Sequence, residues 1–205
     1  DGLIKIGLIE AFERRPRGRW PLPKLRRETF ALSQGQQEAA DRLVADHAQG
    51  FGVSLIDGVT GSGKTEVYFD VLDRLLANPA NTGQILVMLP EIALTGQWLS
   101  RFKQRFGCAP ALWHSELTSK PRAETWRAVA EGEARVVVGA RSALFLPFAD
   151  LGLIIVDEEH EQAYKQEDQV VYHARDMAVL RARLESCPVV LATATPSLES
   201  WVNAG

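Results

Sequence analysis

The chain has 205 residues, of which 46% are hydrophobic, a composition that fits one α/β domain with a substantial core. Its formal net charge of −3 argues against a strongly basic nucleic-acid binder, and no apolar run is long enough to span a bilayer. Cys108 and Cys187 lack metal-like spacing, so we interpret these two cysteines as idle thiols. No signal peptide is recognisable, and we therefore expect a cytoplasmic protein.

Residues 1–27 are predicted to be a leader or connector from a preceding domain, partly irregular, and the absence of an initiator methionine favours a fragment. Within it, residues 3–12 are typical of a short strand or the end of a neighbouring domain. Seven positive and no negative charges lie between Arg14 and Arg27, which leaves a net −10 on the other residues. Because three prolines oppose regular structure here, we interpret this stretch as a solvated linker, with contact to DNA phosphates as the alternative.

From residue 28 onward, short apolar segments alternate with amphipathic ones. A first helix is predicted from Leu32, with Ser33 as its N-cap. Strands are predicted over Val53–Ile56, Ile85–Leu89, Pro110–Trp113, Val136–Val138, Leu153–Val156 and Val189–Ala192. Further helices are predicted near Lys64–Leu76, Leu94–Phe106, Pro121–Glu131 and Ala174–Leu184. This alternation, with strands that are apolar on both faces, predicts a doubly wound α/β domain with a mostly parallel sheet over residues 28–205.

The segment Gly58–Thr65 matches the phosphate-loop pattern G-x-x-x-x-G-K-[ST] at every fixed position. It follows a predicted strand and opens a predicted helix, so backbone N–H groups and the helix N-terminus can surround phosphate oxygens. Lys64 is predicted to reach the β- and γ-phosphates, and the Thr65 hydroxyl to ligate Mg²⁺. We therefore predict ATP and Mg²⁺ as cofactors, with the nucleotide bound by Gly58, Thr60, Gly61, Ser62, Gly63, Lys64 and Thr65.

The apolar strand ending at Val156 runs directly into Asp157, Glu158, Glu159 and His160. Carboxylates at the end of a buried strand are costly unless they have a task, because they lose water there. Asp157 is predicted to hold Mg²⁺ through water, and Glu158 to orient or deprotonate the attacking water. Lys64, Asp157 and Glu158 are thus the predicted catalytic residues.

Three polar loops, at 89–97, 139–145 and 192–197, follow predicted strands. Ligands bind at the carboxyl ends of strands in open α/β sheets. Hydroxyls, backbone amides and Arg141 in these loops suit contacts to a phosphate backbone. The loops therefore favour a nucleic-acid motor over a small-molecule kinase, whose substrate lid has no counterpart in the sequence.

The order of these motifs resembles that of superfamily-2 helicases: P-loop, Pro-Glu-x-x-Leu-Thr, Gly-x-Arg-Ser, Asp-Glu-Glu-His and Ala-Thr-Pro. The sequences of segments 157–160, 164–166, 172–176 and 195–200 resemble those of the PriA family of replication-restart helicases, and the resemblance extends over residues 32–202. This resemblance implies the first RecA-like lobe of an ATP-dependent 3′–5′ DNA helicase.

The resemblance also implies residue roles. Gln36 would read the adenine edge, with Gln37 as the alternative. The loop from Tyr164 onward would sense DNA, with bases stacking on tyrosine and Lys165 and Arg175 meeting phosphates. His160 either relays motion or is an ordinary packed histidine. The implied DNA-contact and coupling residues are Pro90, Thr95, Arg141, Ser142, His160, Tyr164, Lys165, Gln166, Tyr172, Arg175, Thr193 and Thr195.

Further expectations concern what lies outside this sequence. No second RecA-like lobe follows, so the isolated chain is expected to hydrolyse ATP slowly or not at all, and zinc is expected only elsewhere in the full-length protein. The expected partners are single-stranded and forked DNA, other primosome proteins and single-stranded-DNA-binding protein, with no membrane. A superfamily-2 duplex translocase and a non-catalytic P-loop scaffold that recruits primosome proteins are the alternatives.

Overall fold

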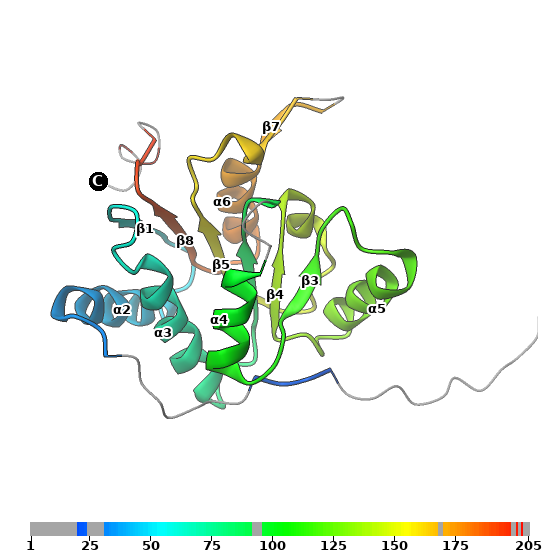
Figure 1. The fold of residues 1–205 in the computed structure, drawn as a ribbon, viewed down its shortest axis with the longest axis horizontal. Coiled ribbons are helices and arrows are strands. Elements are labelled where there is room, and N and C mark those ends of the chain that lie inside the picture. The colour runs from blue at the N-terminus through cyan, green and yellow to red at the C-terminus, as the bar shows by residue number, and fades with distance from the viewer. Residues whose placement is uncertain are drawn as a thin grey trace, which may run out of the picture.

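The computed structural model describes residues 20–23, 31–91, 96–167, 170–197, 200 and 202. Its centre is a sheet of six parallel strands in the order β1-β8-β5-β2-β4-β3 (Figure 1). The strands are β1 (Val53–Asp57), β2 (Gln84–Met88), β3 (Ala111–Trp113), β4 (Val136–Gly139), β5 (Leu151–Asp157) and β8 (Val189–Thr193). A separate antiparallel pair consists of β6 (Lys165–Gln166) and β7 (Tyr172–His173).

Helices cover both faces of the large sheet, as a doubly wound fold requires. They are α2 (Gln34–His47), α3 (Lys64–Ala77), α4 (Gln97–Phe106), α5 (Ser119–Ala130) and α6 (Ala174–Leu184), with short 3-10 helices η2 (Arg141–Phe145) and η3 (Gln162–Tyr164). One core lies between the sheet and α2, α3 and α4; the other lies between the sheet and α5, α6 and η2. Neighbouring residues of β2 serve different cores, Val87 the first and Leu86 the second, which explains why these strands are apolar at every position.

The register of the sheet brings three chain segments to one edge. Asp57 at the end of β1 pairs with Thr193 at the end of β8, and Asp157 at the end of β5 pairs with Ala192. Because all of these strands are parallel, the loops that follow them leave the sheet side by side. The P-loop, the acidic strand end and the last polar loop therefore meet at a common edge.

Two helices next to the P-loop are tied together by a buried cation. Arg105 on α4 is 5% exposed and donates to Asp73 (2.6 Å) and to Glu66 (3.0 Å) on α3. On the core side of α4, Trp98, Phe102 and Phe106 recur every fourth residue, so they lie on one helical face and pack on the sheet. This arrangement fixes α3, and with it the residues that follow the P-loop.

The predicted strands and helices are confirmed, with ends that differ by a few residues. The β6–β7 pair and the two 3-10 helices were not predicted. Leu94 and most of residues 1–27, including the proposed strand at 3–12, lie outside the described residues, so the leader assignment stays a prediction. Trp20 is described and packs against the second core.

Within the described part of the chain, the helices are too short or too polar to cross a bilayer.

Candidate nucleotide site and nucleic-acid surface

The P-loop is anchored to the sheet at its first residue, where the Gly58 N–H donates to the Thr193 carbonyl at 3.2 Å. Gly61 and Gly63 adopt positive φ angles of 81° and 86°, which glycine reaches without strain. Lys64 is 7% exposed, and its Nζ donates to the carbonyl of Gly58 at 2.7 Å. The ammonium group is thus held inside the loop, where a phosphate oxygen would meet it.

Gln36 joins the first helix to the P-loop. Its Nε2 donates to the Ser62 carbonyl at 2.8 Å, while its Oε1 accepts from the Ser33 N–H at 2.9 Å in a capping box. A Cβ at Gly63 would lie 2.4 Å from the Gln36 Nε2, so a larger residue at this position of positive φ would displace the Gln36 side chain. The side chain predicted to read adenine therefore supports the phosphate loop directly, and its contact with a base stays a prediction.

The P-loop and the acidic strand end line the same pocket. Its volume is about 200 Å³, and its lining residues are Gly61, Gly63, Lys64, Thr65, Arg101, Asp157 and Glu158. A larger groove of about 490 Å³ lies between α2 and β1, but Lys64, Asp157 and Glu158 do not line it. We therefore assign the smaller pocket, which gathers the chemically active groups, as the candidate nucleotide site.

The donor set of this pocket fits magnesium. Thr65 offers a hydroxyl and Asp157 a carboxylate, and Mg²⁺ in nucleotide sites takes few protein oxygens and retains several waters. Elsewhere in the described residues no group of three or more His, Cys, Asp or Glu side chains gathers as a metal site would.

Asp157 is held by a relay of polar aromatic side chains that the sequence reasoning missed. Its Oδ2 accepts from the Tyr68 hydroxyl at 2.7 Å, and the Trp98 Nε1 donates to that hydroxyl at 2.7 Å. Burial and the nearby Asp157 charge keep the pKa of Tyr68 well above its usual value, so the phenol stays a donor. The sequence gives only a weak indication of these hydrogen bonds, because both aromatic residues occupy apolar positions of their helices. The indication is that Tyr and Trp carry a polar group that needs a partner when it is buried.

The environment of Asp157 disfavours its charge. The residue is 8% exposed, and this burial is the main reason that its pKa is raised, with the Glu158 charge adding to the effect. The Tyr68 hydrogen bond and the Lys64 charge act in the opposite direction without cancelling it. A divalent cation in the pocket would offset this cost.

Replacing Asp157 with asparagine should therefore stabilise the unliganded chain. An acid whose folded pKa is raised costs folding free energy when ionised, and the cost vanishes as the pH falls through that pKa. We expect Asp157→Asn to raise the melting temperature at pH 7 by a few degrees, about 2–4 °C for each kcal/mol removed. Calorimetry at a series of falling pH values should show that this rise in melting temperature becomes smaller. Glu161→Gln, which changes an exposed carboxylate, is the control. A lower melting temperature for Asp157→Asn at pH 7 would contradict this.

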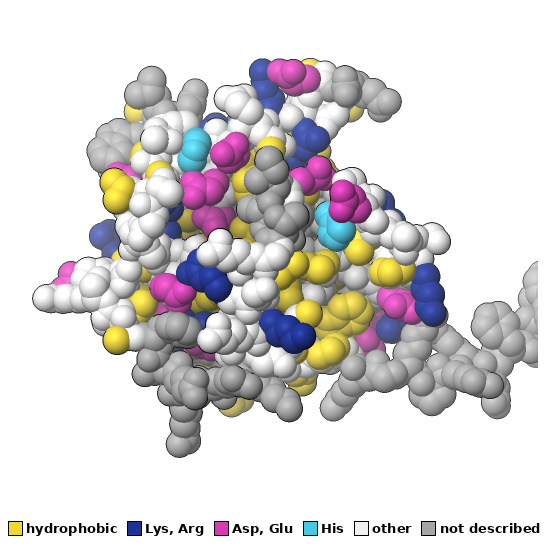
Figure 2. All heavy atoms as spheres, viewed as in Figure 1, with side chains coloured by type: hydrophobic (Ala, Val, Ile, Leu, Met, Phe, Trp, Pro, Cys, Tyr) yellow, Lys and Arg dark blue, Asp and Glu magenta, His cyan; other side chains and the backbone are white. Residues whose placement is uncertain are grey.

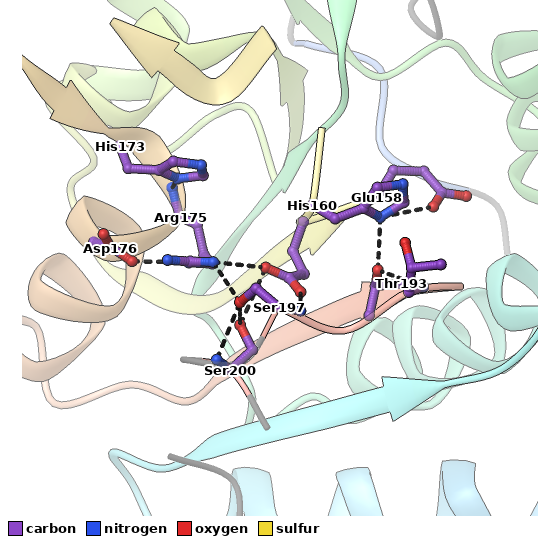
Figure 3. Close-up of polar contacts among 10 residues, drawn as sticks. Glu158, His160, His173, Arg175, Asp176, Thr193, Ser197 and Ser200 are labelled. Carbon is purple, nitrogen blue, oxygen red and sulfur yellow. Dashed lines mark hydrogen bonds and ion pairs between the residues drawn. The ribbon is translucent and has the colours of Figure 1, made fainter. Parts of the chain in front are cut away.

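Glu158, the predicted base, is partly exposed and sits at a positive φ of 50°. His160 lies behind it, with its Nδ1 3.7 Å from a Glu158 carboxylate oxygen and 2.7 Å from the Thr193 Oγ1 (Figure 3). The same hydroxyl oxygen accepts from the Thr195 N–H at 3.2 Å. His160 thus bridges the acidic strand end and the loop after β8, which favours the relay interpretation over an ordinary packed histidine.

The third carboxylate, Glu159, is fully buried and bound on every side. Its oxygens accept from Arg175 at 3.1 Å, from the Ser197 N–H at 3.0 Å and from the Ser200 hydroxyl at 3.1 Å (Figure 3). Arg175 also donates to the Ser197 hydroxyl at 2.7 Å. The expectation that Arg175 meets DNA phosphates is therefore wrong for this conformation, because its guanidinium is buried and joins β5, α6 and the segment after β8.

Loss of Arg175 should destabilise the fold. Removing one partner of a buried ion pair leaves the other charge uncompensated, at a typical cost of about 3–5 kcal/mol. Because serine donors remain on Glu159, we expect Arg175→Ala to cost about 3 kcal/mol in urea unfolding, and the double variant Glu159→Gln/Arg175→Ala to recover part of it. If Arg175→Ala lowers the free energy of unfolding by less than about 1 kcal/mol and also weakens DNA binding, Arg175 contacts DNA phosphates after all.

Tyr164 also differs from expectation. It was predicted to stack on bases, but it is 1% exposed and its hydroxyl donates to the carbonyls of Met88 (3.0 Å) and Asp157 (2.7 Å). A 3-10 turn folds the ring beneath the ends of β2 and β5. Its role is to fix the backbone of the acidic strand end, and a base cannot stack on it here.

The other predicted DNA contacts lie around a second pocket of about 240 Å³. It is lined by Leu89, Pro90, Glu91, Ala140, Arg141, Ala163, Tyr164 and Lys165. Arg141 donates to the Lys165 carbonyl at 2.5 Å and so joins η2 to β6, while Ser142 is exposed. Lys165 is exposed and forms only a surface pair with Glu167 at 2.7 Å, so its ammonium stays accessible.

Gln166 and Tyr172 are half-buried on the β6–β7 pair, and Thr95 lies outside the described residues. Acidic side chains and a histidine gather where β5 ends, at the upper left of the molecule (Figure 2). The two pockets share no lining residue: Lys64, Asp157 and Glu158 line the nucleotide pocket, and Glu91, Arg141 and Lys165 line the second pocket. This separation fits two ligands, a metal-bound triphosphate and a nucleic-acid strand.

Comparison with known families decides the class. The DEAD/DEAH box helicase model matches residues 33–203. The chain belongs to the DEAD/DEAH box helicase family. Helicases of this family use ATP and Mg²⁺, which agrees with the pocket that holds Lys64 and Asp157.

Curated relatives narrow the resemblance. The chain is 51% identical over 152 residues to the replication restart protein PriA of Bacillus subtilis (strain 168), covering 74% of this chain and 18% of that protein. It is 44% identical over 205 residues to PriA of Synechocystis, covering 98% and 24%. The resemblance to the PriA family is confirmed, and the chain spans about a fifth to a quarter of the length of these two relatives.

Solved structures confirm the fold. The helicase domain of Pyrococcus furiosus Hef superposes with a TM-score of 0.55 at 19% identity, over 80% of this chain and 35% of that one. RecG bound to a three-way DNA junction gives a TM-score of 0.62 at 24% identity, over 85% and 22%. The chain therefore has the RecA-like fold of superfamily-2 helicase domains.

Proposed function

We propose that this chain is the ATP- and Mg²⁺-binding first lobe of a 3′–5′ DNA helicase motor that acts in replication restart. The main support is that Lys64, Thr65, Asp157 and Glu158 line one pocket although they come from two distant segments. The PriA relatives support replication restart as the setting.

In the proposed reaction the residues of the chain position the triphosphate and the attacking water, and they stabilise the charge of the transition state. Lys64 would leave the Gly58 carbonyl and meet the terminal phosphate oxygens, where negative charge builds up in the transition state. Thr65 and Asp157 would hold Mg²⁺, which supplies charge neutralisation at those oxygens. Glu158 would orient the attacking water and accept its proton, since its carboxylate is partly exposed beside the pocket.

The second pocket supports a path for single-stranded DNA. We propose that Pro90, Arg141, Ser142 and Lys165, with Thr95, contact the sugar-phosphate backbone. His160 and Thr193 connect the loop after β8 to Glu158 through contacts of 2.7 and 3.7 Å. If DNA binding shifts the loop after β8, the Glu158 carboxylate, which is the proposed general base, would thereby change position.

A helicase motor of this kind binds ATP between two lobes. We propose that a second lobe contributes an arginine to the transition state, a contribution worth roughly 10³–10⁵ in rate in related enzymes. The isolated chain should accordingly turn over ATP slowly or not at all. Primosome proteins and single-stranded-DNA-binding protein are proposed as further partners, and the cytoplasm as the location.

Strand displacement tests this function. The full-length protein that contains this sequence should unwind, with ATP and Mg²⁺, a forked duplex carrying a 3′ single strand for loading and should fail when only a 5′ strand is present. Lys64→Ala serves as the inactive control. Displacement of a triplex strand without unwinding of the fork would instead establish a duplex translocase, and binding without any turnover would establish a scaffold.

A further inference from the structure

An aromatic side chain that lines neither the nucleotide pocket nor the second pocket projects from η2. Phe145 is 56% exposed, whereas Leu144 and Leu146 on either side of it are 1% and 2% exposed. A single exposed apolar side chain is ordinary on a protein surface. Its meaning depends on how it is held and on what surrounds it.

The backbone on both sides of Phe145 is clamped to α6. Arg181 donates to the carbonyl of Leu144 and, at 2.9 Å, to the carbonyl of Leu146, and its guanidinium lies over the Phe148 ring at 5.1 Å. With both neighbouring leucines in the core, Phe145 cannot turn inward without breaking these contacts. The ring is therefore held outward in advance, at little further entropic cost on binding.

A second aromatic fixes the orientation of the Phe145 ring. Tyr172 on β7 packs against it edge-to-face, with ring centroids 5.7 Å apart and planes at 89°. This pair joins η2 to the β6–β7 hairpin, in the same way as the Arg141 contact to the Lys165 carbonyl. Edge-to-face packing fixes the tilt of a ring and covers at most one of its two faces, so at least one face of Phe145 is left for another partner.

The polar surroundings indicate the partner. Ser142 and Phe145 are both exposed and three residues apart on a 3-10 helix, whose side chains at this spacing lie above one another. The exposed Lys165 belongs to the hairpin that Arg141 binds. An exposed hydroxyl next to an exposed aromatic ring suits single-stranded nucleic acid, with a phosphate on the polar group and a base on the ring. Lys165, which pairs with His173 and not with Tyr172, offers its cation on the other face of the β6–β7 pair.

We propose that Phe145, oriented by Tyr172, is the stacking platform for one unpaired DNA base, a role that the family resemblance implied for the tyrosines of the loop from Tyr164 onward. This inference rests on the proposed single-strand path and adds a base-contacting residue to it. Stacking tolerates every base, so the contact would hold the strand without reading its sequence.

Equilibrium binding of labelled strands to the full-length protein tests the proposal. One strand is intact; the other has the same phosphates but lacks bases. Phe145→Ala should weaken binding of the intact strand by roughly 5- to 150-fold and leave binding of the base-free strand unchanged. Phe145→Trp should retain affinity and Phe145→Leu should not, since leucine keeps apolar bulk without a π-face. Trp126→Ala, at an aromatic on α5 that is 51% exposed, is the matched control.

Each outcome decides a different question. Equal losses on the two strands, no loss on either, or full rescue by leucine would overturn the stacking role; rescue by leucine would indicate an apolar anchor instead. If the unsubstituted protein binds neither strand, the proposed single-strand path itself fails and the stacking site falls with it.

Discussion

Replacing Lys64 with alanine is expected to reduce DNA-stimulated ATP turnover roughly 100- to 1,000-fold in the full-length protein. Lys64 is 7% exposed, and within the described part of the chain its ammonium group donates to carbonyls of its own loop, so phosphate would be its first charged ligand. Losing a preorganised positive group where transition-state charge develops has a cost of this size. Turnover is measured by phosphate release over a range of ATP concentrations.

The same substitution should hardly change affinity for forked DNA, because Lys64 lines the nucleotide pocket and not the second pocket. Lys103→Ala, at an exposed lysine on α4, is the matched control and should leave both properties unchanged. Equal losses of turnover and fork binding in Lys64→Ala would contradict the assignment of the two pockets to two ligands.

Replacing Glu158 with glutamine should separate ATP binding from hydrolysis. A positioned general base contributes typically 10²–10⁴ to rate, and the amide retains the shape of the side chain without its basicity. We expect turnover to fall by about that factor while ATP affinity stays within about threefold, since uniform binding is not affected. Single-turnover hydrolysis together with binding of a fluorescent ATP analogue measures the two quantities separately.

Glu161→Gln provides the comparison, because Glu161 is an exposed carboxylate in the loop that follows Glu158. It should leave turnover unchanged. If Glu158→Gln retains full turnover, another residue is the general base. If ATP affinity is lost together with the rate of hydrolysis, Glu158 contributes to binding of the metal rather than to activation of the water.

The sequence predicted the backbone of this molecule better than its side-chain contacts. Runs such as Ile154-Ile155-Val156 are apolar at every position, and only a strand covered on both faces satisfies that pattern. The P-loop was predictable because glycines at Gly61 and Gly63 mark positive φ angles that other residues avoid. Two-residue strands such as β6 and β7 are too short to leave a periodic pattern, so they were missed.

Buried polar contacts could not be predicted because they depend on which residues the tertiary fold brings together. Tyr68 and Asp157 are 89 positions apart in the sequence, and only the adjacency of α3 and β5 places the hydroxyl 2.7 Å from the carboxylate. The family resemblance led to the assignment of Arg175 and Tyr164 as DNA contacts, since an aromatic ring and a cation suit a nucleic-acid strand. The fold places both beneath the site, where they fix the backbone that carries Asp157 and Glu158.

The structure of the chain crystallised with Mg²⁺ and a non-hydrolysable ATP analogue tests the central claim most directly. We predict the terminal phosphates next to the Lys64 Nζ, which will have left the Gly58 carbonyl, with the metal between the Thr65 hydroxyl and Asp157. A triphosphate bound in the groove between α2 and β1, with Lys64 still hydrogen-bonded to Gly58, would contradict the account.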